Sequence, residues 1–347
     1  MRPLLILITV LMIIAQTGCG KTQAAEPVSG DNYLLDTICT ISIYEMKGED
    51  GEPVPAADME EEALAAIDKA FDLCADLDKK LSRTVDVSDV SRINQAGGEW
   101  TEVSDETAEL LTAGRYYSEL SEGRFDITVG GVTSLWDFHA DPENARLPDE
   151  EALKEAVSHV GYEGLEIDGN NVRLEDPEAM IDLGGIAKGY IGDRMTDLLI
   201  EEGVTSGIVN LGGNVICIGG KTAEDDFVIG VEAPFSDRSE IVGKVNARDM
   251  TLVTSGVYER KIEVDGKQYH HILDTSTGWP AETDLDAVTL CAARGKSMDI
   301  DALSTICLIL GSEKAGELIE TIDGVEAVFI LSDGTIEKTS GMEFEAE

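Results

Sequence analysis

Hydrophobic positions along the chain follow two spacings, one typical of helices and one typical of strands. Apolar residues three and four positions apart predict amphipathic helices over residues 60–81, 105–120, 148–160 and 298–310. Short apolar runs predict strands over residues 38–44, 207–218, 227–232, 250–254 and 288–292, with a final hairpin over 327–331 and 335–338. Because no Pro/Ser-rich linker and no internal repeat interrupts the chain after residue 31, we expect one large α+β domain over residues 31–347.

The first thirty residues have the pattern of an export signal followed by a tether. Arg2 precedes an apolar run over residues 4–15, which is too short to span a bilayer but has the length of a signal-peptide core. The segment ends in Thr-Gly-Cys19 and resembles a bacterial lipobox, although Gln16 stands where leucine is commonest. This resemblance implies palmitate-type acylation of Cys19 and an exported lipoprotein held at the bacterial cell membrane, with its folded domain outside the cytoplasm. A cleaved secretory peptide, in which Cys19 has no role, is the alternative.

Cleavage before Cys19 would separate a signal peptide over residues 1–18 from a polar tether over residues 19–30. Without Cys19 the chain keeps an odd number of cysteines and has no C-x-x-C pair. A disulfide framework or a zinc knuckle is therefore not expected.

Charge excludes one class of partner. The chain has 26 Lys and Arg against 69 Asp and Glu, a formal net charge of −43. Nucleic acid is bound by neutralising its phosphates with Lys and Arg, so a basic patch here would lie within a repelling field. We expect no nucleic-acid partner. With 43% hydrophobic residues, the chain can still bury a sizeable core.

Several common catalytic motifs are absent from the sequence. It contains no H-E-x-x-H, no G-x-S-x-G and no G-x-x-x-x-G-K-[ST]. The glycine pairs at Gly184-Gly185 and Gly212-Gly213 do not fit G-x-G-x-x-G, so a Rossmann-type nucleotide site is not indicated.

Polar and glycine-rich segments separated by ordinary scaffold carry the chemical signal instead. The most specific are D-L-G-G-I-A-K-G from Asp182, T-S-G-V-Y from Thr254 and H-I-L-D-T-S-T-G-W-P from His271. In this order and spacing they resemble the ApbE family of flavin transferases, and the resemblance runs from Leu35 to about Gly311. It implies a single large ApbE-like, T-fold-like domain. Thr275 departs from the family pattern, in which proline is common at that position.

Asp301 and Thr305 are the candidate metal ligands. They lie four residues apart on a predicted helix and therefore share one face. A carboxylate and a hydroxyl, completed by carbonyl and phosphate oxygens, suit Mg²⁺. The family pattern adds Gly185 and Ser304 to this metal site. Alternatively, Asp301 only stabilises the N-terminal part of its helix.

The resemblance also implies a set of contacts to FAD. The glycine turn at Gly184-Gly185 lets a ligand approach the backbone, and Lys188 after it suits a phosphate. The alternative is a plain strand-to-helix turn with Lys188 exposed to solvent. For Leu35 and Phe125, the alternative role is packing in the hydrophobic core. Thr84 lacks the aromatic ring common at its position, so no stacking is expected there. The implied FAD-contacting residues are Leu35, Thr84, Arg124, Phe125, Asp126, Asp182, Lys188 and Ile272.

His270 and His271 are adjacent, so in a strand only one of them can face a site. The family pattern selects His271. A neutral imidazole could accept the proton of an attacking hydroxyl, whereas the alternative role is to order the turn by hydrogen bonding. His271 and Asp301 are therefore the candidate catalytic residues.

Together these residues imply Mg²⁺-dependent transfer of the FMN half of FAD to a Thr or Ser hydroxyl of a partner protein, with release of AMP. In the family the acceptor is a subunit of an electron-transfer complex or a protein with an FMN-binding domain. Two other functions stay open: an FAD pyrophosphatase, in which water replaces the hydroxyl, and a non-catalytic flavin-binding lipoprotein.

Overall fold

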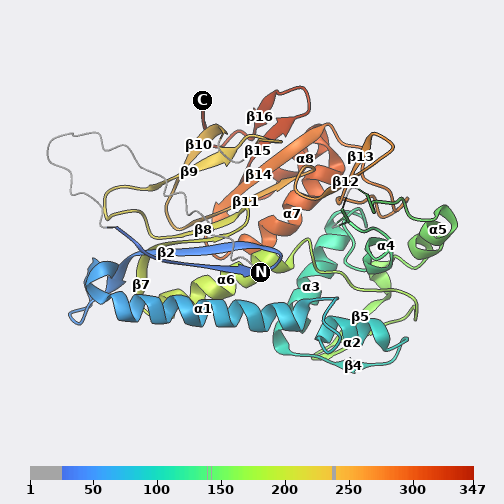
Figure 1. The fold of residues 1–347 in the computed structure, drawn as a ribbon, viewed down its shortest axis with the longest axis horizontal. Helices are drawn as coiled ribbons and strands as arrows, with labels where there is room; N and C mark the ends of the chain where they lie inside the picture. Colours follow the sequence, from blue (N-terminus) through green and yellow to red (C-terminus); the bar gives the residue numbers. More distant parts are fainter. Residues whose placement is uncertain (1–25, 139, 142, 237–239) are drawn as a thin grey trace, which may run out of the picture.

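A computed structural model describes residues 26–138, 140–141, 143–236 and 240–347. Its centre is a nine-stranded antiparallel sheet with the order β1-β2-β7-β8-β11-β14-β15-β16, and β3 pairs with the far end of β2 (Figure 1). The strands are β1 (Val28–Leu34), β2 (Thr37–Lys47), β3 (Pro53–Pro55), β7 (Val204–Leu211), β8 (Asn214–Ile218), β11 (Met250–Gly256), β14 (Leu285–Ala293), β15 (Val325–Leu331) and β16 (Ile336–Lys338).

Helices cover one face of this sheet and bury most of the core against it. The buried apolar residues of these helices and of the sheet form one continuous hydrophobic cluster, in which α1 lies against β1 and α7 lies against β11 and β14. The covering helices are α1 (Glu60–Leu81), α6 (Ala187–Glu201), α7 (Ser297–Leu310) and α8 (Ser312–Ile319).

A second, three-stranded sheet packs on the opposite face. It has the order β17-β10-β9 and encloses a separate cluster that includes Cys217, Phe227 and Leu252. Its strands are β9 (Phe227–Glu232), β10 (Ile241–Ala247) and β17 (Glu345–Ala346). The central sheet is therefore covered on both faces over β8, β11, β14 and β15.

The remaining elements form a flank beside the ends of α1 and α7 (Figure 1). A small sheet with the order β4-β6-β5 and a β12–β13 hairpin belong to this part. These elements are α2 (Asp89–Gln95), β4 (Thr101–Glu102), α3 (Asp105–Leu120), α4 (Gly130–Thr133), α5 (Glu150–Ser158), η2 (Tyr162–Gly164), β5 (Leu165–Asp168), β6 (Asn171–Leu174), β12 (Lys261–Val264) and β13 (Lys267–His270). The short helix η1 (Ala56–Met59) lies elsewhere, since it directly precedes α1 and contacts β2 and β3.

Most predicted elements are present, with three differences. The strand predicted over residues 207–218 is wrong, because Gly212 and Gly213 adopt positive φ and turn the chain between β7 and β8. Pro148 does not begin a helix: Asp149 caps α5 by accepting from Glu151 N and Ala152 N at 3.0 Å. The last part of the predicted tether, from Val28, is already paired in β1. Cys19 and the signal peptide lie outside the described residues.

The five cysteines after Cys19 are buried and unbonded, as the sequence predicted. In the part of the chain that the structure describes, no helix combines the length and the apolar character needed to cross a bilayer.

Candidate active site

A cavity of about 510 Å³ lies where the central sheet, α1, α7 and the flanking elements meet. Segments distant in sequence converge on it: the β1–β2 turn, the end of α1, the glycine turn before α6 and the segment around His271. Of the predicted residues it brings together Leu35, Thr84, Arg124, Phe125, Asp126, Asp182, Gly185, Lys188, His271, Ile272, Asp301 and Thr305. This volume lies within the range of small-molecule and cofactor sites.

Asp301 is buried at the point where α6 and α7 approach most closely. Its Oδ2 accepts a hydrogen bond from Gly189 N at 2.8 Å. A Cβ at Gly189 would lie 2.6 Å from the Ser297 carbonyl carbon and 2.8 Å from Asp301 Cβ, so only glycine allows this approach. Burial raises the pKa of Asp301, while the Lys188 charge and the Gly189 N–H oppose that rise.

A carboxylate on α6 secures the same junction between the two helices. Asp193, one turn after Gly189, accepts from Ser297 N at 3.2 Å and Met298 N at 3.0 Å, the first amides of α7. Burial raises the pKa of Asp193 to about 6. The two contacts between α6 and α7 hold Asp301 in a fixed place.

The residues around Asp301 fit a hard cation. Its Oδ1 and the Thr305 hydroxyl have no hydrogen-bond partner among the described residues, and both residues line the cavity. A Cβ at Gly185 would lie 3.4 Å from Thr305 Oγ1, so the backbone of the glycine turn lies close to this hydroxyl. Carboxylate, hydroxyl and carbonyl oxygens suit Mg²⁺. Among the described residues no three His, Cys, Asp or Glu side chains form a metal cluster, so external ligands would have to complete the coordination.

Ser304 differs from the prediction. It is fully buried and does not line the cavity. Its hydroxyl donates to the Asp301 carbonyl at 2.7 Å, which leaves its oxygen in contact with Ser255 Oγ at 2.8 Å. The side chain lies behind Asp301 and joins α7 to the end of β11, so the hydroxyl of Ser304 is not directed into the cavity.

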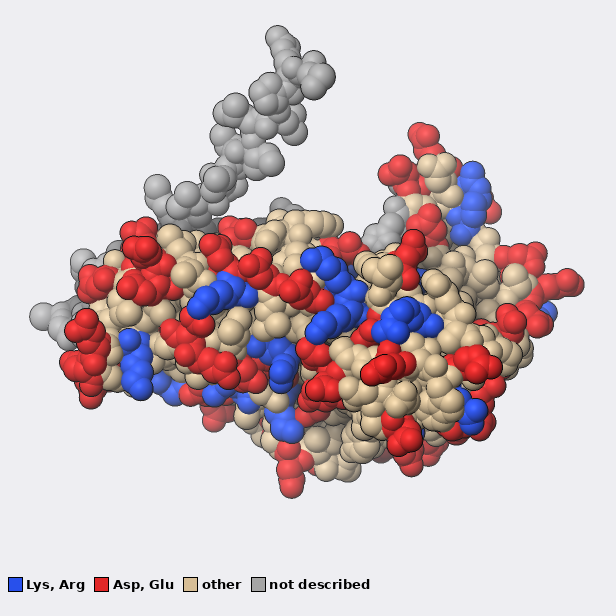
Figure 2. Space-filling view, turned by 90° about the horizontal axis from the view of Figure 1, so that it is seen from below, with Lys and Arg blue, Asp and Glu red and all other residues tan. Residues whose placement is uncertain are grey.

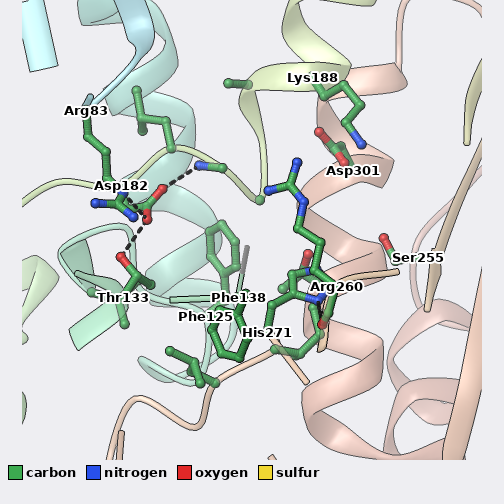
Figure 3. Close-up of a pocket in the computed structure, with 18 of the residues that line it drawn as sticks. Arg83, Phe125, Thr133, Phe138, Asp182, Lys188, Ser255, Arg260, His271 and Asp301 are labelled. Carbon is green, nitrogen blue, oxygen red and sulfur yellow. Dashed lines mark hydrogen bonds and ion pairs between the residues drawn. The ribbon is translucent and has the colours of Figure 1, made fainter. Parts of the chain in front are cut away.

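Asp182 is held in a network at the opposite wall of the cavity. Its Oδ2 accepts from Arg83 Nε at 2.9 Å and from Thr133 Oγ1 at 2.7 Å, and its Oδ1 accepts from Gly184 N at 2.9 Å (Figure 3). The carboxylate therefore fixes the glycine turn to α4 and to the segment after α1. Arg83 also donates to Ser134 Oγ at 3.1 Å.

Asp126 lines the cavity, but both oxygens of its carboxylate accept hydrogen bonds from other protein groups. Its Oδ1 accepts from Thr128 N and Oγ1, and its Oδ2 accepts from Tyr162 N at 2.9 Å. Burial raises its pKa. This arrangement favours a structural role for the side chain, in contrast to the FAD contact that the resemblance implied.

Aromatic rings come from a neighbouring segment, since residue 84 has none. Thr84 Oγ1 shares a hydrogen bond with Ser82 Oγ at 2.9 Å. Phe125, Trp136 and Phe138 line the cavity. The rings of Trp136 and Phe138 are stacked, with 5.3 Å between their centroids. Ile272 and Leu35 add apolar surface. The cavity thus offers the apolar walls that a flat ring system requires.

Leu35 and Asp36 form the two-residue turn between β1 and β2. Both have positive φ, 53° and 57°, a conformation that non-glycine residues rarely adopt. A Cβ at Gly212 would lie 2.8 Å from Thr37 Cβ, so the β7–β8 turn packs tightly against this hairpin. The β1–β2 turn is thereby held at the cavity, and this close packing explains why residue 212 is a glycine.

His271 faces the cavity, whereas His270 does not line it. The Arg260 carbonyl lies 3.1 Å from His271 Nδ1, and a carbonyl can only accept. We therefore assign the proton of the neutral ring to Nδ1, which leaves Nε2 as the basic nitrogen. Burial lowers the pKa of His271 to about 4.

Cationic side chains gather in the cavity despite the strongly acidic composition. Arg83, Arg124, Lys188 and Arg260 all line it. Arg124 and Lys188 form no ion pair with any described residue, and Figure 3 shows Lys188 beside Asp301. The Arg260 guanidinium nitrogen Nη2 lies 3.9 Å from Asp36 Oδ2. Such groups can bind an anionic ligand such as a diphosphate.

Several cavity residues were missed from the sequence, among them the polar residues Arg83, Thr133 and Arg260 and the aromatic residues Trp136 and Phe138. Arg83 and Arg260 lie within the range of the family resemblance, but nothing in their spacing indicates a cavity-facing position. Thr275 was noted only as a departure; its hydroxyl donates to the Gly123 carbonyl at 2.6 Å, a bond that proline could not make.

Comparison with known proteins gives a consistent result. The ApbE family model matches residues 35–329. An FAD:protein FMN transferase of Treponema pallidum is 32% identical over 96% of this chain and 93% of its own length, and one of Klebsiella pneumoniae is 32% identical over 80% and 84%. The crystal structure of an ApbE protein from Thermotoga maritima superposes with a TM-score of 0.80 at 32% identity, covering 91% of this chain and 97% of that one.

A flavinyl transferase ApbE of Pseudomonas stutzeri superposes with a TM-score of 0.75 at 29% identity, covering 91% of this chain and 95% of that chain. The residues that the family model matches include every segment that lines the cavity. This chain belongs to the ApbE family.

Proposed function

We propose that this protein is an FAD:protein FMN transferase, which moves the FMN half of FAD onto a Ser or Thr hydroxyl of a partner protein. The observation that carries the proposal is one cavity in which Asp301 and Thr305, free cations and apolar rings lie together. An apolar wall suits the isoalloxazine ring, and Lys188 and Arg124 suit the diphosphate. The named relatives support the same activity.

The reaction exchanges one phosphate–oxygen bond for another. The acceptor hydroxyl oxygen forms a bond to the phosphorus on the FMN side of the diphosphate. The bond from that phosphorus to the bridging oxygen breaks, and its electron pair leaves with AMP. His271 Nε2 takes the hydroxyl proton, which requires the neutral ring that burial maintains. The product is FMN joined to the acceptor by a phosphoester.

Asp301 and Thr305, with the backbone near Gly185, are the residues that would hold Mg²⁺. When bound, Mg²⁺ would neutralise charge on the phosphate oxygens during cleavage. Lys188 contributes further positive charge from the first turn of α6. In a protein with a net charge of −43 this local concentration of positive charge is necessary, since the global field repels an anionic ligand.

We further propose that the domain acts outside the cytoplasm, anchored to the membrane through acylated Cys19. The support is the apolar run and lipobox-like segment at the N-terminus. The acceptor would be a subunit of an electron-transfer complex or an FMN-binding-domain protein, met at that membrane surface.

The test is to incubate the purified protein with FAD, Mg²⁺ and a candidate acceptor, following acceptor mass and nucleotide products. We expect the acceptor to gain one FMN and AMP to appear, with both lost in EDTA and restored by Mg²⁺. Free FMN and AMP without acceptor modification would indicate the pyrophosphatase instead. Tight FAD binding with no cleavage at all would indicate a flavin carrier.

A further inference from the structure

The edge of the central sheet nearest the cavity is unprotected. Among the described residues β1 pairs only with β2, and no backbone hydrogen bond joins it to any other segment. The register runs without a bulge from Val28 to Leu34. Proteins usually protect such an edge with prolines, charged side chains, bulges or very short strands, and of these β1 has only one charged residue, Asp31.

The opposite edge of the same sheet provides an internal comparison. It is formed by β16, which has three residues and ends in Lys338. That edge is short and charged, which discourages another strand from pairing with it. The seven-residue edge at β1 is therefore exceptional within this sheet.

The hydrogen-bonding groups of β1 that point away from β2 can be assigned from the hairpin. In a two-residue hairpin the closing pair, here Leu34 and Thr37, exchanges its backbone hydrogen bonds across the strands. Because the pattern alternates, the N–H and C=O groups of Ser29, Asp31 and Tyr33 point away from β2. Tyr33 N agrees with this assignment, since it donates to Asn32 Oδ1 at 2.9 Å rather than to β2.

The edge leads directly to the cavity. Tyr33 lies two residues before Leu35, a distance of roughly 7 Å in an extended chain. Leu35 and Asp36 both line the cavity. Tyr33 and Ile38, the cross-strand pair next to this turn, are 68% and 65% exposed, which places apolar surface beside the mouth.

We infer that the edge of β1 is the docking site for the acceptor, which adds to the sheet as an extended strand and continues past Tyr33 into the cavity mouth. The inference rests on the proposed function. An extended polypeptide is the occupant that matches alternating N–H and C=O groups. An apolar side chain of the segment would cover Tyr33 and Ile38, and its Ser or Thr would follow within a few residues. Given the net charge of −43, we expect uncharged or basic flanking residues.

The probe is a library of short peptides with a single central threonine, incubated with the protein, FAD and Mg²⁺ and read by mass spectrometry. A flavinylated peptide is then resynthesised with one backbone N-methyl group at each position in turn. Strand addition requires alternate amides, so we expect flavinylation to fall at every second residue along the docked segment. Loss without this two-residue period, or no peptide modified while an intact acceptor protein is, would overturn the inference.

Variants of β1 provide the matching test on the protein. Asp31→Pro removes one outward N–H while leaving the inward hydrogen bonds to β2, and Asp31→Ala separates the contribution of the side chain. We expect Asp31→Pro to raise the KM for the peptide about fivefold more than Asp31→Ala does, with FAD affinity unchanged. Equal KM values for the two variants would contradict the docking site.

The apolar pair has its own control. Tyr33→Ser should raise the KM for the peptide, whereas Val228→Ser, at a 60% exposed valine on β9 in the other sheet, should not. Amide exchange over residues 28–34 should slow when the peptide binds. If the wild type flavinylates no acceptor, the proposed function fails; if it does so with no change in these readouts, only the docking site fails.

Discussion

Asp301 is the side chain on which the proposed chemistry most depends. It is buried, one of its oxygens is held by Gly189 N, and its other oxygen has no partner among the described residues. We expect Asp301→Ala to lower FMN transfer by roughly a hundredfold or more, since charge stabilisation at the phosphates would be lost. The rate of acceptor modification at saturating FAD measures this effect.

Asp299 on the same helix is the matched control. It does not line the cavity, and it accepts from Tyr117 OH at 2.8 Å and Lys296 Nζ at 3.0 Å. Asp299→Asn should lower thermal stability but leave transfer within a few-fold of wild type. If Asp301→Ala transferred FMN at the rate of Asp299→Asn, Asp301 would have no place in the reaction.

His271 makes a prediction about pH. Burial favours the neutral imidazole and lowers its pKa to about 4, so the ring stays unprotonated as the pH falls through the usual histidine range. We expect kcat/KM for the acceptor to show no histidine-type loss near about pH 6.5, and His271→Gln to lower kcat with FAD affinity kept. An acidic limb centred there, absent in His271→Gln, would show that the free protein holds a protonatable His271.

At this scale the sequence predicted some side chains and missed others for a physical reason. Asp301 and Thr305 share a helix face, so their spacing of four residues was sufficient to pair them. Arg83 reaches Asp182 across 99 residues of chain, which no local spacing can indicate. The Ser304 hydroxyl donates to the Asp301 carbonyl within the helix and does not face the cavity, an orientation that the family pattern does not reveal.

The α6–α7 junction is the element pair that builds the site. Gly189→Ala would place a Cβ 2.8 Å from Asp301 Cβ and 2.6 Å from the Ser297 carbonyl carbon, so the helices would have to separate. We expect a loss of about 1–3 kcal/mol in the free energy of unfolding, together with weaker transfer. Chemical denaturation of the apoprotein measures the first effect.

Gly316 on α8 is the control for that substitution. Nothing lies within 4 Å of the position its Cβ would occupy. Gly316→Ala should therefore be neutral or stabilise the protein by up to about 1 kcal/mol, because alanine favours helix. A Gly189→Ala variant as stable as Gly316→Ala would mean that the helices do not need this close approach.

Element prediction succeeded where the periodicity was strong and failed at turns within apolar sequence. The helix over residues 60–81 was predicted with the bounds of α1, because its apolar residues repeat clearly. The β7–β8 hairpin was predicted as one strand over residues 207–218 because both of its arms are apolar. The sequence signal for a turn at this point was the adjacent pair Gly212-Gly213, and both residues adopt positive φ in the structure.

At the scale of the whole molecule, acidic side chains dominate the surface. Figure 2 shows Asp and Glu spread over the face seen from below, with Lys and Arg in small separate groups. The face that Figure 2 shows therefore offers no continuous basic surface. This pattern also makes the cations inside the cavity distinctive, since they lie where an anionic ligand would bind.

The membrane anchor is tested on the full chain in a bacterial host. We expect the wild type to fractionate with membranes and to carry acyl groups on its mature N-terminal Cys19. Cys19→Ala should lose both properties while the purified domain keeps FMN transfer, because every described residue of the cavity follows the first strand, which begins at Val28. A Cys19→Ala protein that is still membrane-bound and acylated would refute the lipobox interpretation.

The most direct measurement of the central claim follows each phosphorus of FAD separately. FAD labelled in its FMN phosphate, and a second sample labelled in its AMP phosphate, are incubated with the protein, Mg²⁺ and an acceptor. We expect the first label to appear on a Ser or Thr of the acceptor and the second in AMP, in equal amounts. The proposal would be contradicted if the acceptor carried the AMP label, or if the FMN label were released only as free FMN.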